Sequence, residues 1–147
     1  MTGPMSTNRT RNLRTTRRAG RAVSALGAGF LTAAAGSWVL IRKELLAENI
    51  TVHDDVKKFA GKKVADPFTA YAQADIVNKH ALAMTGGKPF AELPMDAPER
   101  QTALMAANVR SSLLTSVLSF GLSGLTAGVG VTALLAGRGL KSAAKGE

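Results

Sequence analysis

The sequence predicts an all-α membrane protein, a two-helix transmembrane hairpin with a mostly helical extracytoplasmic segment between the spans. Residues 22–41 form an uncharged, mostly apolar run of 20 residues, and residues 111–137 form a second run of 27. At ~1.5 Å per residue these runs make helices of roughly 30 and 40 Å, enough to cross a hydrocarbon core of ~30 Å. Neither run has the polar stripe of a helix that covers a soluble core.

The distribution of charge predicts the orientation. The formal net charge is +9, with six arginines and no acidic residue before the first run and three basic residues against Glu147 after the second. Residues 42–110 carry ten basic and nine acidic side chains. The positive-inside rule therefore predicts a multi-pass membrane protein with both termini cytoplasmic. The arginines suit contact with anionic lipid headgroups, whereas the absence of interleaved aromatic residues disfavours nucleic acid.

These patterns divide the chain into five parts, and we expect the first helix to run from near Arg17 to about Glu48. A secretory signal is an alternative for the first run, because Ala33–Gly36 resembles a cleavage site. The apolar run nevertheless continues to Ile41, which favours a retained span. The parts are a disordered basic cytoplasmic tail (1–18), a first transmembrane helix (19–44), an extracytoplasmic helical segment (45–110), a second transmembrane helix (111–137) and a cytoplasmic tail (138–147).

Between the runs, capping residues predict where helices begin. Asp66 followed by Pro67 is typical of an N-cap and first helical residue, residues 68–84 contain no Gly or Pro, and Gly86 with Gly87 is a stop signal, so we expect a helix over 67–84. Residues 88–95, with two prolines, are predicted to be a loop.

Two further sequences resemble capping boxes. Thr51 with Asp54 is a weak one, before residues 56–60. Asp96 with Glu99 is a clearer one, and it predicts that the second long helix begins at Pro98, outside the membrane.

Small residues form a stripe along each apolar run. Such stripes let helix backbones approach closely in a membrane. The partner is either the other helix of this chain or another membrane subunit, and both can hold at once. The predicted helix-packing residues are Ala25, Gly29, Ala33, Ser37, Gly121, Gly124 and Gly128.

Candidate residues for chemistry are few. Cysteine is absent, which excludes thiolate catalysis and zinc–thiolate sites. His53 and His80 have Asp54, Asp55 and Asp75 as possible carboxylate partners, and two histidines with one carboxylate can form a facial triad for iron. Their spacing matches no known pattern, so we interpret both histidines as solvated side chains and predict no catalytic, cofactor or metal residue.

Several segments together resemble a family of small actinobacterial membrane proteins of unknown function, many of which bear the name aromatic ring-opening dioxygenase. The resemblance covers about residues 20–137, and it implies a bacterial plasma-membrane location and the two-span layout, without an established activity. The segments are Ala47-Glu48-Asn49-Ile50-Thr51-Val52-His53-Asp54-Asp55, residues 67–76, His80-Ala81-Leu82, Thr85-Gly86-Gly87-Lys88 and residues 110–120.

The sequence thus favours a non-catalytic accessory or scaffolding protein in contact with the bilayer and with another membrane protein or a second copy of itself. A respiratory or transport complex is a concrete setting for such a protein. The alternative is a metal-dependent, dioxygenase-like enzyme that uses His53, His80 and an Asp at the outer face.

Overall fold

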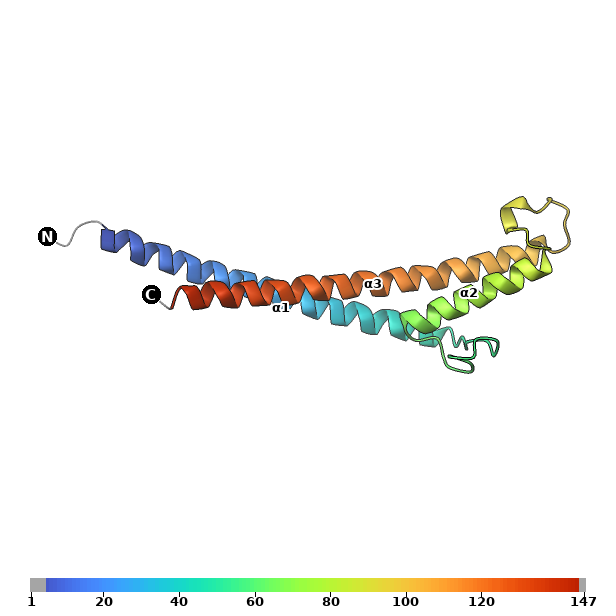
Figure 1. Ribbon diagram of the computed structural model, residues 1–147, viewed down its shortest axis with the longest axis horizontal. Helices are drawn as coiled ribbons and strands as arrows, with labels where there is room; N and C mark the ends of the chain where they lie inside the picture. The colour runs from blue at the N-terminus through green and yellow to red at the C-terminus, as the bar shows by residue number, and fades with distance from the viewer. Residues whose placement is uncertain (1–4, 146–147) are drawn as a thin grey trace. The chain divides into compact units, whose positions relative to one another are not determined.

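The computed structural model describes residues 5–145, and the prediction of an all-α fold is confirmed over these residues. The helices are α1 (Met5–Ala47), α2 (Pro67–Met84), the short 3-10 helix η1 (Phe90–Glu92) and α3 (Arg100–Ala143) (Figure 1). The chain divides into two compact units, residues 38–122 and the residues on either side of them. Both long helices run through the two units, which are described in turn.

The first unit holds the beginning of α1 and the end of α3. The prediction that residues 1–18 are disordered is wrong from Met5 onward, where α1 already begins; residues 1–4 lie outside the described residues. The reason lies in local propensity. Arginine is a good helix former, and residues 5–19 contain no glycine or proline.

Both long helices are apolar and extended enough to span a membrane, α1 over Arg11–Ala47 and α3 over Arg100–Ala143. Large apolar side chains on them point outward, as Leu26 and Leu125 illustrate with 62% and 66% of their surface exposed. Hydroxyl groups within the apolar runs bond to the helix's own backbone, which removes their need for water. The hydroxyls of Ser24, Thr32, Ser37, Thr115, Ser116, Ser119 and Thr132 each donate to the carbonyl four residues earlier.

In the first unit α1 and α3 pack antiparallel through small residues spaced by seven. A Cβ added at Gly27 would lie 2.7 Å from the Gly130 carbonyl oxygen, and one at Gly20 would lie 2.8 Å from that of Gly137. Seven residues forward along α1 therefore correspond to seven residues back along α3. This spacing is the heptad period of left-handed helix pairs, and a small residue at each contact lets the backbones approach.

The second unit has its own apolar core. It is formed where the end of α1, the following loop, α2 and the first half of α3 meet, and Trp38 packs edge-on against Phe120 with ring centroids 4.6 Å apart. Burial of these apolar side chains is the main force that orders the unit. The buried core residues are Leu45, Val52, Val64, Ala70, Ala74, Leu113 and Phe120.

The loop between α1 and α2 is not helical, so the weak capping box at Thr51 and Asp54 starts no helix. Instead Thr51 pairs with Lys63 in an isolated antiparallel bridge, and Val52 N–H donates to the Lys62 carbonyl at 2.9 Å. Val52 is almost fully buried between the exposed residues Thr51 and His53, and its burial anchors the loop to the core.

Helix α2 follows its predicted signals. The Asp66 carboxylate accepts hydrogen bonds from the backbone N–H groups of Phe68 and Thr69, and the Thr69 hydroxyl completes a capping box. Gly86 and Gly87 follow the helix with φ of +64° and +87°, a conformation that favours glycine.

Helix α3 begins two residues later than predicted, at Arg100, so the Asp96–Glu99 box does not cap it. The Ala97 carbonyl accepts the Arg100 N–H at 3.1 Å, which makes a turn of the residues before the helix. The Arg100 guanidinium donates to the carbonyls of Phe90 and Leu93 and lies 4.4 Å from the Phe90 ring centroid. These contacts tie η1 to the start of α3.

Candidate functional site

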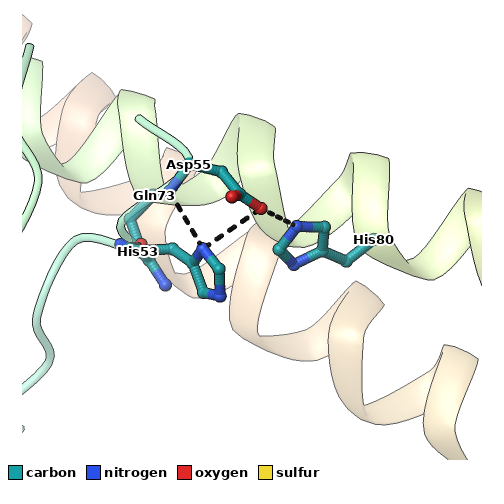
Figure 2. Close-up of polar contacts among 4 residues, drawn as sticks. All are labelled: His53, Asp55, Gln73 and His80. Carbon is teal, nitrogen blue, oxygen red and sulfur yellow. Dashed lines mark hydrogen bonds and ion pairs between the residues drawn. The ribbon is translucent and has the colours of Figure 1, made fainter. Parts of the chain in front are cut away.

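Two histidines and an aspartate meet on the second unit, between the α1–α2 loop and α2. The Asp55 Oδ2 atom lies 2.9 Å from His80 Nε2 and 3.3 Å from His53 Nδ1 (Figure 2). The two imidazole rings are edge to face, with centroids 4.6 Å apart. The ligand-capable atoms of the three residues all lie within 4.8 Å of one another.

Backbone contacts hold the loop in place beneath this cluster. The His53 backbone N–H donates to Gln73 Oε1 at 2.9 Å, and the Asp55 backbone N–H donates to His53 Nδ1 at 3.2 Å (Figure 2). Gln73 and His80 are seven residues apart on α2, so they share one helix face. The same face therefore fixes the loop and supplies a member of the cluster.

The cluster is open to solvent, as the sequence predicted for both histidines. The side chains of His53, Asp55 and His80 are 50%, 60% and 44% exposed. The sequence analysis grouped both histidines with one carboxylate only as an alternative, and it left Asp54, Asp55 and Asp75 as equal candidates for that carboxylate. The structure selects Asp55.

Asp75 has a different partner. Its carboxylate lies 2.7 Å from the Lys79 ammonium one turn along α2, and that hydrogen bond raises the pKa of Lys79 above its usual value. Asp75 therefore forms an ion pair with Lys79 on the surface of α2 and is not a fourth member of the cluster.

The donor set fits a divalent transition metal. Metal–ligand distances of about 2.0–2.2 Å place neighbouring donor atoms about 3.0–3.6 Å apart, close to the 2.9 Å and 3.3 Å that separate Asp55 Oδ2 from His80 Nε2 and His53 Nδ1. The single lone pair of His53 Nδ1 accepts the Asp55 backbone N–H in this arrangement, so coordination through that nitrogen requires this hydrogen bond to be released. Imidazole and carboxylate suit zinc, cobalt, nickel and iron. Exposure leaves the remaining coordination positions to water.

A separate cavity of about 260 Å³ lies between α2 and the start of α3, lined among others by Asn78, Leu82 and Arg110. Asn78 and Leu82 are each two residues from His80, which places them on roughly the opposite side of α2. The cavity and the His–Asp cluster thus open on different faces of the helix.

The predicted helix-packing stripes face away from the contact between α1 and α3. A Cβ added at Gly29, Gly121, Gly124 or Gly128 would meet no atom within 4 Å. Gly29 lies in an open apolar groove on α1, and Gly124 and Gly128 lie in one on α3. The contact between the chain's own helices instead uses the small residues spaced by seven, and packing of the stripes against another subunit stays a prediction.

The small residues spaced by seven were not predicted from the sequence, because the stripes spaced by four consist of equally small residues. The signal was present: Gly20, Gly27 and Ala34 repeat every seven residues, as do Ser123, Gly130 and Gly137, and all six are buried.

Comparison of the chain with models of protein families, with curated proteins and with solved structures finds no match.

Proposed function

We propose that this chain is a two-span accessory protein of the bacterial plasma membrane that holds a divalent transition-metal ion at His53, Asp55 and His80. The observation that carries the metal site is the convergence of three ligand-capable atoms within 4.8 Å from segments 25 residues apart in sequence. The metal binds in the polar segment between the spans.

The membrane placement rests on the outward apolar side chains of both long helices and on their internally bonded hydroxyls. In water, so much exposed apolar surface would drive aggregation. In a bilayer it faces acyl chains, and helices are among the few structures that satisfy their own backbone there. The basic flanks 9–21 and 138–145 support cytoplasmic termini. The resemblance to small actinobacterial membrane proteins supports a bacterial plasma membrane.

The site supports binding rather than catalysis. Its three protein ligands are about half-exposed, and the neighbouring cavity opens on the other side of α2. An enzyme site usually excludes water and lines a pocket with the reacting groups. The role we assign to the ion is to crosslink the α1–α2 loop to α2, because His53 and Asp55 belong to the loop and His80 to the helix.

Metal titration of the purified chain tests the site. The protein contains two histidines and no cysteine, so a preparation without a polyhistidine tag has few competing ligands. We expect one Zn²⁺ or Co²⁺ per chain by calorimetry, with the Co²⁺ visible spectrum reporting nitrogen and oxygen ligands. Asp55→Ala and His80→Ala should weaken binding at least about ten-fold, since even the loss of a supporting residue has that effect.

Asp54→Ala is the matched control, because it removes the adjacent carboxylate and should leave metal affinity unchanged. Both metal-site variants should keep the circular dichroism of the wild type, since the side chains are exposed. Equal metal affinity in Asp54→Ala, Asp55→Ala and wild type would show that the cluster is not the binding site.

The accessory role is supported by the two open grooves on the first unit. Gly29 on α1 and Gly128 on α3 each lie in an apolar groove, and close packing of helices in membranes favours such small residues. Because the chain lacks cysteine, a single Leu125→Cys variant in native membranes reports self-association by a disulfide-linked dimer. A monomer whose copurifying proteins are unchanged by Gly128→Leu would remove the support for this role.

A further inference from the structure

A basic cleft lies at the end of the first unit, where α1 and α3 meet. Its volume is about 410 Å³. Spacings of three and four residues place its side chains on one face of each helix. The residues that line it are Arg17 and Arg21 of α1, Arg138, Lys141 and Ser142 of α3, and Lys145 just after α3.

Close helix packing brings these charges together. A Cβ added at Gly20 would meet the Gly137 carbonyl at 2.8 Å and the Lys141 Cγ atom at 3.0 Å. The stem of Lys141 therefore lies directly against Gly20, which neighbours Arg21 on α1. A larger residue at position 20 would separate the two basic faces.

Acidic residues are scarce around the cleft. The sequence has no Asp or Glu before Glu44, and none after Glu99 except Glu147, which lies outside the described residues. Five like charges around one cleft repel one another, and an anion bound among them would relieve that repulsion.

The position of the cleft along the helices indicates the class of anion. Arg21 directly precedes the uncharged run 22–41, and Arg138 directly follows the run 111–137. The cleft thus borders the apolar surface of the same unit, at the level where a bilayer presents its headgroup phosphates.

We infer that this cleft binds the phosphate groups of an anionic phospholipid headgroup. Arginine contributes paired N–H donors that match phosphate oxygens, and lysine contributes a mobile point charge. The inference rests on the proposed membrane placement and is independent of the metal site.

Native mass spectrometry of the full chain in a neutral detergent tests the inference. Titration with cardiolipin, phosphatidylglycerol and phosphatidylcholine should give retained adducts with the two anionic lipids and not with the zwitterionic one. Arg21→Gln combined with Lys141→Gln should weaken anionic-lipid binding about 25-fold, or about five-fold per basic residue removed.

The matched control is Arg14→Gln combined with Arg18→Gln, which removes two arginines of the same basic tail that do not line the cleft. The control should lose much less anionic-lipid affinity than the cleft variant, because its arginines lie outside the cleft and salt screens exposed charges. An equal loss in both double variants would mean that lipid responds to total charge, and would overturn the site.

Soluble competitors identify the source of the phosphate. Inorganic phosphate and glycerol phosphate should displace the lipid poorly, because neither uses the apolar surface beside the cleft. Displacement by either at lipid-like concentrations, or tighter binding of an oligonucleotide, would overturn the lipid assignment. Membrane fractionation is scored separately, so a membrane-inserted protein that binds no anionic lipid refutes only this inference.

Discussion

Replacement of Gly27 by alanine tests the packing of α1 against α3 most directly. The new Cβ would lie 2.7 Å from the Gly130 carbonyl oxygen and 2.8 Å from the Leu134 backbone nitrogen. Both are backbone atoms, which cannot rotate aside as a side chain can. The helices must therefore separate locally by about 0.5–0.7 Å to restore ordinary contact. A gap of that size removes about a quarter to a half of the dispersion energy of each neighbouring atom pair.

The expected cost follows from two opposing effects. Overpacking of this kind costs about 1–3 kcal/mol, whereas alanine is a better helix former than glycine by about 0.5–1 kcal/mol. Gly27→Ala should therefore lower the free energy of unfolding by roughly 0.5–2 kcal/mol. Gly29→Ala is the matched control, because no atom lies within 4 Å of its Cβ position. It should leave stability unchanged or raise it slightly.

Both variants can be unfolded by SDS titration in mixed micelles and followed by circular dichroism. Equal destabilisation by Gly29→Ala and Gly27→Ala would contradict close packing of Gly27 against the α3 backbone. That result would mean that the residues spaced by four, not those spaced by seven, form the contact between the two helices.

Three further predictions concern the second unit and the orientation of the chain. Asp66→Ala should destabilise the first turn of α2 by about 0.5–2 kcal/mol through the lost cap, seen as faster hydrogen exchange there, while Asp96→Ala should change nothing because α3 begins beyond it. Arg100→Gln removes the guanidinium that donates to two carbonyls near η1, so protease should cleave that loop faster than in wild type; equal cleavage would contradict the anchoring role. Reporter fusions at Ala83 and Glu147 should show extracytoplasmic and cytoplasmic activity, respectively, and periplasmic-type activity at Glu147 would overturn the proposed orientation.

The sequence by itself determined the number and type of the long helices, although it placed the start of the first near Arg17 and the helix begins at Met5. Uncharged runs of 20 and 27 residues, the Asp66–Pro67 start and the Gly86–Gly87 stop are local signals. They act through backbone conformation and neighbouring hydrogen bonds, so they can be interpreted without knowing what lies opposite. The capping box at Asp96 and Glu99 was a weaker guide, because α3 begins beyond it, at Arg100.

Only the tertiary structure decided which residues meet across the chain. Each long helix has small residues spaced by four and by seven, and only the opposing backbone selects the series that includes Gly27 and Gly130. The His53–Asp55–His80 cluster has the same origin: Asp54 and Asp55 are chemically alike, but Asp55 is the one whose carboxylate meets His80, in a loop held by the Thr51–Lys63 bridge and the Gln73 hydrogen bond. A contact between residues 25 positions apart depends on the path of the intervening backbone, which the chemistry of the two contacting side chains does not specify.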